Sequence, residues 1–188
     1  TGPLHFGSLL TAVASYCDAK ANHGKWLVRI EDTDIARIYP HSEAHILSCI
    51  DAFQFEPDAE IIFQKDRLEL YEQVLEQLKQ LQAVYACQCT RKMLGSNHIY
   101  TGTCRDLRLD FSQQAIRLKV ADQLICFDDR LQGQQCSNLQ HDLGDFVLKR
   151  RDDIISYQLA VVVDDYLQGI THVVRGADLL DNTTRQIW

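Results

Sequence analysis

The sequence predicts an α/β fold that carries one small insertion, and three observations support this prediction. Helix-like and strand-like apolar patterns alternate over residues 1–84 and again over residues 141–188, as is typical of α/β proteins. Residues 85–140 break this alternation with short strand-like pieces, turns and cysteines, which indicates an inserted subdomain. With 188 residues, 46% of them hydrophobic, the chain is long enough to bury the core of one such domain.

Five elements are expected before the insertion: helices over 7–23, 40–53 and 66–83, and strands over 26–30 and 61–63. The first helix has apolar residues at helical spacing and Gly24 in the place of a C-cap. The third helix has Asp66 as its expected N-cap, and it carries Leu68, Tyr71 and Leu75 on one side. Four elements are expected after the insertion: strands over 145–150 and 170–175, and helices over 156–167 and from about 181.

The charge balance limits the functions that fit this chain. A net charge of −7 and an estimated pI of 5.4 argue against indiscriminate nucleic-acid binding, which needs a broad basic face. They still allow a folded RNA held by a local basic patch, such as the Lys149-Arg150-Arg151 cluster. No apolar run reaches the length of a membrane span and no signal-peptide pattern occurs, so we expect a cytoplasmic protein without membrane contact.

Seven cysteines occur, and we expect reduced thiols because the count is odd and no secretion signal accompanies it. Cys17, Cys49 and Cys126 lie in apolar patterns and are expected to pack as small hydrophobic residues. Cys136 has no evident partner.

The other three cysteines predict a metal site. Cys87 and Cys89 are one residue apart, and Cys104 follows after a loop, so three thiolates could surround one Zn²⁺. Zinc in structural sites takes four ligands in a tetrahedron. The chemistry of the ligands favours His98 as the fourth, because imidazole is common and phenolate rare, whereas Tyr100 is the alternative.

The start of the chain predicts a nucleotide site. Thr1-Gly2-Pro3-Leu4-His5-Phe6-Gly7-Ser8 leads into the first helix, and Arg29-Ile30-Glu31-Asp32-Thr33-Asp34 ends the first strand. Backbone N–H groups at a helix N-terminus suit a phosphate, particularly beside a glycine. A carboxylate at the end of the next strand suits a cationic group, because α/β sheets bind ligands at the carboxyl ends of their strands.

These two segments resemble a known family. His5-Phe6-Gly7-Ser8 resembles the HIGH signature of class I aminoacyl-tRNA synthetases, and 29–34 is similar to the glutamate-binding strand of glutamyl-tRNA synthetases. The segments 156–165 and 169–176 also match that family closely. The resemblance covers essentially the whole chain. It implies a Rossmann-like catalytic fold over 1–84 and 141–188 with a zinc-bearing, acceptor-binding-like subdomain over 85–140.

The resemblance also implies the roles of individual residues. His5, Gly7 and Ser8 would act on ATP as catalytic residues, and Leu180 would border the adenine. Glu31 would bind the ammonium group of L-glutamate, and Tyr157 and Arg175 would face the rest of that substrate. Mg²⁺ is expected to accompany ATP.

Two features point to one branch of the family, the glutamyl-queuosine tRNA(Asp) synthetases. Their Cys-x-Cys…Tyr-x-x-x-Cys arrangement matches here and implies structural Zn²⁺ bound by Cys87, Cys89, Tyr100 and Cys104. Val161 stands where ordinary glutamyl-tRNA synthetases have asparagine. The implied reaction is ATP-dependent activation of glutamate and transfer to queuosine in the anticodon loop of tRNA(Asp), by a monomer without an anticodon-binding domain.

Three other hypotheses differ from this one. An ordinary glutamyl-tRNA synthetase is disfavoured by the tyrosine of the metal pattern and by Val161. A catalytically silent zinc-bearing RNA-binding module would leave the joint presence of His5, Glu31 and Arg175 unexplained. A dinucleotide-binding oxidoreductase lacks its G-x-G-x-x-G motif after a strand. Because the chain begins inside a motif and without Met, we expect it to be part of a longer protein that also carries a KMSKS-type loop.

Overall fold

The computed structural model describes residues 2, 4–94 and 99–188, so that Thr1, Pro3 and His98, the fourth ligand favoured by ligand chemistry, lie outside the described residues. The chain forms two compact units. Unit 1 consists of Thr1–Leu68 and Asp165–Leu180, and unit 2 consists of Glu69–Asp164 and Asp181–Trp188. Each is described by itself below. The predicted subdomain over 85–140 falls within unit 2, and its boundaries stay a prediction.

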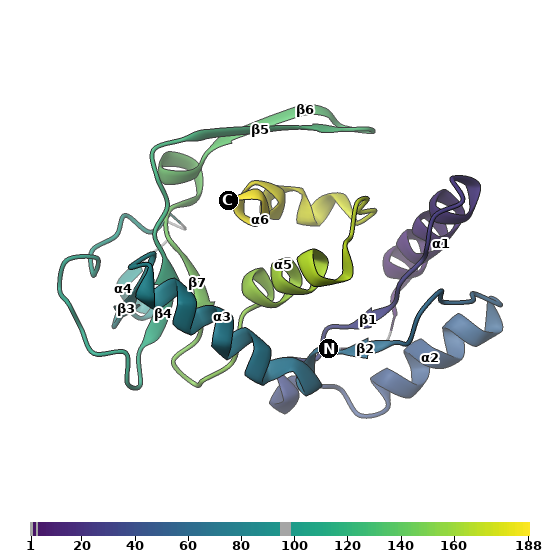
Figure 1. Ribbon diagram of the computed structural model, residues 1–188, viewed down its shortest axis with the longest axis horizontal. Helices are drawn as coiled ribbons and strands as arrows, with labels where there is room; N and C mark the ends of the chain where they lie inside the picture. Colours follow the sequence, from purple (N-terminus) through teal and green to yellow (C-terminus); the bar gives the residue numbers. More distant parts are fainter. Residues whose placement is uncertain (1, 3, 95–98) are drawn as a thin grey trace. The chain divides into compact units, whose positions relative to one another are not determined.

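Unit 1 is built round a short parallel sheet. Strands β1 (Arg29–Ile30) and β2 (Ile62–Phe63) pair in parallel, and they lie between helices α1 (Phe6–Ala21) and α2 (Ser42–Ala52) (Figure 1). A short 3-10 helix, η1 (Ile35–Arg37), follows β1. A parallel pair with a helical crossover confirms the α/β prediction for this part of the chain.

An aromatic cluster forms the apolar centre of unit 1. The Tyr16 ring of α1 lies 5.2 Å from that of Trp26 and 4.7 Å from that of Phe55, measured between ring centroids. Trp26 also donates its indole N–H to Ser15 Oγ at 3.0 Å, which satisfies a half-buried polar group. These contacts hold α1 against the segments that precede β1 and β2.

Two predicted helix caps are wrong. Helix α1 ends with Asn22 as its C-cap, and His23, not Gly24, takes the left-handed conformation with φ of 55°. Asp66 lies inside a 3-10 turn, η2 (Gln64–Arg67), that leads directly into α3 (Leu68–Gln80), so it does not cap that helix. The buried face of α3 carries Tyr71 and Leu75, as its apolar spacing predicted.

Unit 2 contains a three-stranded antiparallel sheet. Its strands are β3 (Val84–Cys87), β4 (Ala115–Leu118) and β7 (Phe146–Lys149), in the order β3-β4-β7. A short helix, α4 (Arg91–Leu94), follows β3. The strand predicted over 145–150 therefore pairs with a strand from the predicted insertion. Alternation along the sequence could not reveal that pairing.

A buried carboxylate supports this sheet. Asp145, 1% exposed, accepts hydrogen bonds from Tyr85 Oη at 2.5 Å, from Arg105 Nε at 2.6 Å and from the backbone N–H of Val120 at 2.9 Å. A buried charge needs such a full set of partners, because desolvation is costly. The network therefore ties the loop after Cys104 to the sheet.

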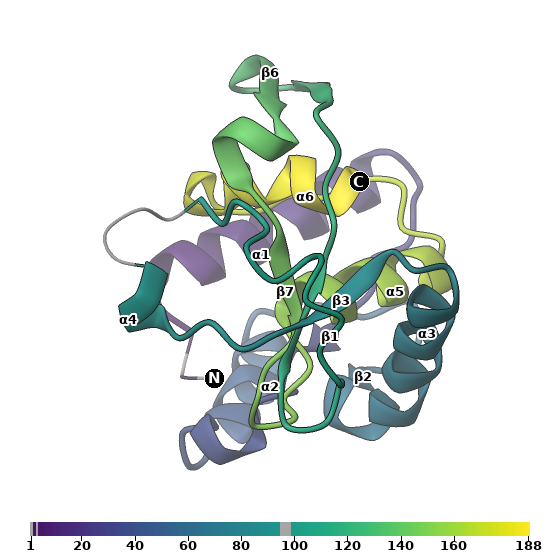
Figure 2. The same cartoon turned by 90° about the vertical axis from the view of Figure 1, so that its left-hand side faces the viewer.

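The second sheet of unit 2 is a hairpin, and it corrects the prediction for two cysteines. Strands β5 (Leu124–Asp129) and β6 (Gly133–Asn138) pair antiparallel and are followed by a π-helical turn, η3 (Leu139–Leu143). Cys126 and Cys136 lie directly opposite each other and form a disulfide, so they are neither reduced nor unpartnered. In both views the hairpin projects away from the β3–β4–β7 sheet (Figure 2).

The C-terminal part differs from the prediction in one element. Helix α5 (Tyr157–Gln168) confirms the helix predicted over 156–167, whereas 170–175 contains no strand. The chain then forms a 3-10 helix, η4 (Ala177–Asn182), and α6 (Thr183–Ile187). Among the described residues, no helix is long and apolar enough to cross a membrane.

Candidate nucleotide and metal sites

A cavity of about 540 Å³ opens in unit 1. Its lining comes from the start of α1, the end of β1, the start of α2 and residues 175–179. This volume lies within the usual range for small-ligand pockets, about 300–1,000 Å³. The lining includes five residues that the sequence analysis singled out: His5, Gly7, Ser8, Glu31 and Arg175. The fold therefore brings together three segments that are far apart in the sequence.

His5 caps the helix that begins this cavity. Its Nδ1 accepts a hydrogen bond from the backbone N–H of Ser8 at 3.2 Å, and its Nε2 lies 3.1 Å from Ser8 Oγ. When Nδ1 accepts, the proton of a neutral imidazole is on Nε2. The ring thus presents its N–H next to the Ser8 hydroxyl, at the positive end of the α1 dipole.

Two glycines give the cavity its shape. A Cβ on Gly7 would lie 3.2 Å from both Cε1 and Nδ1 of His5, so the imidazole occupies space that a side chain would need. A Cβ on Gly176 would overlap Oδ1 of Asp178. A side chain at either position would therefore make its neighbour shift, by a few tenths of an ångström in the case of the His5 ring.

Glu31 is held by an arginine from its own strand. Arg29 Nη2 lies 3.4 Å from Glu31 Oε1 and 2.8 Å from Asp165 Oδ1, while its Nη1 donates to Gln168 Oε1 at 2.7 Å. Arg29 therefore bridges β1 and the end of α5. The sequence analysis did not identify this role, because the partners of Arg29 are separated from it by more than a hundred residues.

A second charged group in the cavity was also missed. Asp32, 5% exposed, accepts the backbone N–H of Lys65 at 2.8 Å. The Lys65 ammonium contacts Asp32 at 3.3 Å and Glu43 at 3.0 Å, and its hydrogen bond to Glu43 raises the pKa of Lys65. Asp32 directly follows Glu31, and its low exposure, which depends on tertiary packing, could not be read from the sequence.

Two of the predicted substrate residues lie outside the described lining. Tyr157 is the first residue of α5 and belongs to unit 2. Leu180 belongs to unit 1 and lies in η4, and the lining as described includes Leu179 rather than Leu180. The roles of both stay predictions.

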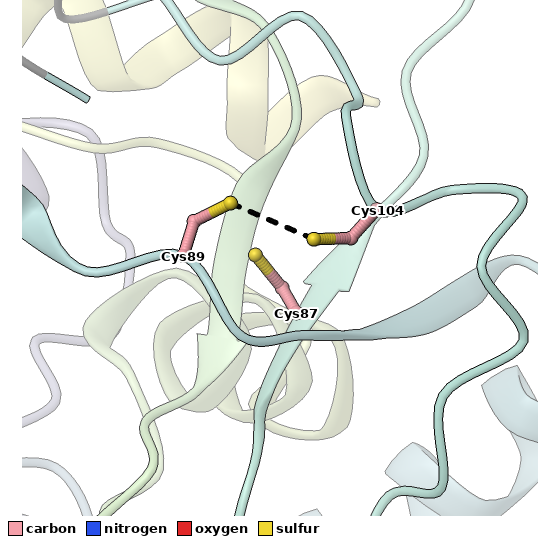
Figure 3. Close-up of side chains that lie close together, drawn as sticks. All are labelled: Cys87, Cys89 and Cys104. Carbon is pink, nitrogen blue, oxygen red and sulfur yellow. Dashed lines mark hydrogen bonds between the residues drawn. The ribbon is translucent and has the colours of Figure 1, made fainter. Parts of the chain in front are cut away.

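Unit 2 brings three cysteines together as a metal site would require. The Sγ atoms of Cys87, Cys89 and Cys104 all lie within 4.8 Å of one another and turn toward a common centre (Figure 3). The Sγ atoms of Cys89 and Cys104 are 3.5 Å apart. Tyr100 completes the group, because its Oη lies 3.3 Å from Cys87 Sγ and 3.4 Å from Cys89 Sγ.

The spacing of these donors fits tetrahedral zinc. Zn–S bonds of about 2.3 Å place two sulfur ligands about 3.8 Å apart. The cluster is nearly closed to water, since Cys87, Tyr100 and Cys104 are each at most 4% exposed. Burial raises the pKa of the Tyr100 phenol, and its hydrogen bonds to the thiols add to this, so that without a metal the phenol keeps its proton.

An arginine compensates the charge of this cluster. Arg117 Nε lies 3.3 Å from Cys87 Sγ, and its guanidinium carbon lies 4.0 Å from the centroid of the Tyr100 ring. Three thiolates round a divalent cation carry a net negative charge, which a buried guanidinium stabilises. Arg117 was not predicted for this role, because its contacts with Cys87 and Tyr100 depend on how the chain folds.

Comparison with known proteins gives consistent matches over the whole chain. Residues 1–188 match the family model for tRNA synthetases class I (E and Q), catalytic domain. The chain is 81% identical over 188 residues to the glutamyl-Q tRNA(Asp) synthetase of Acinetobacter baylyi and 50% identical over 200 residues to that of Cupriavidus metallidurans. It spans 64% of the length of each of these relatives.

Solved structures match as well. A glutamate tRNA ligase from Elizabethkingia meningosepticum, in complex with its amino acid, superimposes with a TM-score of 0.86 at 28% identity. The match covers all of this chain and 44% of the ligase. The glutamate-tRNA synthetase of Elizabethkingia anophelis gives the same values.

Proposed function

Because the chain belongs to the class I tRNA synthetases for glutamate and glutamine, whose catalytic domain it matches over its full length, we propose that it activates L-glutamate with ATP. We propose further that it transfers the glutamyl group to queuosine in the anticodon loop of tRNA(Asp), as the names of its relatives indicate. The proposal depends on one observation: His5, Ser8, Glu31 and Arg175 line the same cavity.

The charges of the cavity suit glutamate as the substrate. The Glu31 carboxylate binds the substrate ammonium, and Arg29 holds that carboxylate at 3.4 Å. Arg175 provides charge-assisted hydrogen bonds to a substrate carboxylate. The family resemblance implies that Tyr157 is a neutral donor to the substrate, which would be left without a partner if a shorter or apolar side chain were bound.

Activation of glutamate requires alignment rather than a protein nucleophile. One oxygen of the glutamate carboxylate, already ionised at neutral pH, attacks the α-phosphorus of ATP, and the bond from that phosphorus to the bridging oxygen of pyrophosphate breaks. The start of α1 binds the phosphates through backbone N–H groups, and the Nε2–H of His5 donates to the developing negative charge. Leu180 borders the adenine. Mg²⁺, bound with ATP, supplies further charge stabilisation.

The remaining assignments concern the rest of the protein. Cys87, Cys89, Tyr100 and Cys104 hold a structural Zn²⁺, because four protein ligands leave no coordination position for a substrate. The acceptor is an RNA loop, where bases are accessible to a protein. We propose a monomeric, cytoplasmic enzyme.

The proposal is tested by measuring transfer of labelled glutamate by the full-length protein to two purified RNAs. Queuosine-containing tRNA(Asp) is expected to accept the label, and tRNA(Glu) is not. Label on tRNA(Glu) alone would assign the ordinary aminoacylation reaction instead. Label on neither, together with no exchange of pyrophosphate into ATP, would contradict an activating enzyme.

The role of Glu31 is tested by Glu31→Gln, which keeps the shape of the side chain and removes its charge. We expect the KM for glutamate in pyrophosphate exchange to rise at least tenfold, because the ammonium group loses its ionic partner. Glu60→Gln is the matched control, since Glu60 is exposed in the same unit and does not line the cavity. Equal KM values for the two variants would reject the assignment.

A further inference from the structure

A second cavity, of about 810 Å³, opens on unit 2. Three glutamines, a serine, a methionine and an arginine line it: Gln88, Met93, Ser112, Gln113, Gln114 and Arg151. They come from the end of β3, from α4, from the loop before β4 and from the turn after β7. None of them takes part in the activation chemistry proposed above.

One arginine joins two walls of this cavity. Arg151 Nη2 donates to the backbone carbonyl of Gln88 at 2.9 Å and to Gln114 Oε1 at 3.2 Å. Its neighbours in the basic cluster are bound to carboxylates: Lys149 to Glu72 and Asp153, and Arg150 to Asp152. Within the described residues, the contacts of Arg151 are to neutral oxygens, so its charge is not neutralised by a carboxylate.

The metal site and this cavity share a stretch of backbone. Gln88 stands between Cys87 and Cys89, whose thiols turn toward the metal cluster. In an extended chain alternate side chains point to opposite sides, and Gln88 is accordingly exposed and lines the cavity.

The lining chemistry selects a nucleotide. Among the residues that the structure describes, none in the lining is a carboxylate, although the chain has 26 acidic and 19 basic residues. Glutamine amides both donate and accept hydrogen bonds, as the edges of bases require. A guanidinium offers a flat surface for a base and a charge for a phosphate, and a methionine side chain adapts to a flat ring.

We infer that this cavity binds one unpaired nucleotide of the RNA acceptor, with the base edge against the glutamines and Arg151 on the base or its phosphate. Proteins recognise RNA sequence mainly through single-stranded loops whose bases turn outward, and such a base fits a polar cavity of this size. The inference rests on the proposed function, because it takes the partner to be an RNA.

The test uses two substitutions in the full-length protein, each with a control of the same charge change. Gln113→Glu places a negative charge in the cavity. Its control, Gln77→Glu, places one on the exposed face of α3. Arg151→Gln removes the cavity cation, and Arg150→Gln removes the neighbouring one. We expect the dissociation constant for queuosine-containing tRNA(Asp), measured by fluorescence anisotropy, to rise about tenfold for the two cavity variants and less than twofold for the controls.

Pyrophosphate exchange without RNA separates this inference from the proposed function. The cavity variants are expected to exchange at the rate of the unmodified protein. An unmodified protein that fails to exchange would contradict the proposed function, and the RNA dissociation constants would still test the cavity. Unchanged RNA affinity in Gln113→Glu, or an equal loss in both controls, would overturn the inference. If the cavity variants lose AMP binding but keep their RNA affinity, the cavity is assigned to a free nucleotide, and this result would also overturn the inference.

Discussion

Single residues in the unit 1 cavity depend on the small size of their neighbours. The imidazole of His5 rests where a Gly7 side chain would lie, and both ring nitrogens face Ser8. Residues 5–8 at the start of α1 therefore have two roles. They cap the helix through His5, which accepts the Ser8 N–H, and they place the positive end of the α1 dipole at the cavity.

Gly7→Ala tests this close packing. The added methyl would lie 3.2 Å from two ring atoms of His5, so the ring must move away from Ser8. We expect kcat/KM for pyrophosphate exchange to fall about tenfold, which corresponds to about 1.4 kcal/mol of transition-state stabilisation. Thermal stability should change little, because the helix propensity gained with alanine offsets the cap lost when His5 moves. A fall in stability that matches the loss of activity would contradict this explanation.

The sequence motifs indicate which residues gather at the cavity better than they indicate the residues in contact with them. His5, Gly7, Ser8 and Glu31 stand in dense motifs, and the structure places all four in the cavity lining. Arg29, Asp32 and Lys65 were missed as a group because their contacts join segments that lie far apart along the chain. Such contacts follow from tertiary structure, which local spacing does not encode.

At the scale of elements, the proposed zinc site would join the end of β3 to the loop that carries Cys104. Cys89→Ser is expected to lower the zinc content of the purified protein from about one ion per chain to near zero. It should also lower the melting temperature by about 10 °C or more, since a structural zinc contributes several kcal/mol and 1 kcal/mol shifts Tm by about 2–4 °C at this size.

Cys49→Ser is the control for the metal ligand. Cys49 is a free, half-buried cysteine in α2, and its loss should leave the zinc content unchanged. Metal analysis by mass spectrometry and calorimetry of both variants would check this. A Cys89→Ser protein that keeps its zinc would show that this thiol is not a ligand.

Asp145 is expected to stabilise the β3–β4–β7 sheet through its buried hydrogen bonds. Asp145→Asn leaves Arg105 and Tyr85 without their carboxylate partner. Breaking a buried ion pair from one side costs about 3–5 kcal/mol, and we expect urea unfolding to show a loss of that size. Asp128→Asn, at an exposed position of β5, should change stability by less than about 0.5 kcal/mol. Similar losses in both variants would argue against the network.

The disulfide is expected to stabilise the β5–β6 hairpin. Two-stranded hairpins are marginal by themselves, and Cys126–Cys136 closes this one across its turn. Reduction with dithiothreitol, or Cys136→Ser, should speed hydrogen exchange of the amides over 126–136 and leave α3 unchanged. Equal exchange before and after reduction would show that the bond adds nothing to the hairpin.

The elements missed by the sequence share a cause. Pairing of Cys126 with Cys136 depends on the hairpin register, which the turn between Asp129 and Gly133 sets. The signal was available, because the two cysteines are symmetric about that turn. Residues 170–175 include four β-branched side chains, as strands often do, yet no strand forms there, because propensity gives way to tertiary context.

At the scale of the whole molecule, the order of the chain differs from the order of its units. The chain leaves unit 1 after Leu68, returns to it at Asp165 and leaves it again after Leu180. Unit 2 likewise takes its last helix, α6, from the end of the chain. The α/β class was predictable from alternating elements, whereas this interleaving was not, because it concerns which elements pack together.

The interleaving has a consequence during synthesis on the ribosome. The first part of unit 1 is complete at Leu68, but the Arg175 wall of its cavity is made only after the intervening 96 residues, 69 to 164. At about 5–20 residues per second, that delay is about 5–20 seconds. During this interval the nascent chain contains only the first segment of unit 1, whose apolar surface is exposed to chaperones. The rate of translation through residues 69–164 therefore sets how long the nascent chain can misfold before unit 1 is complete.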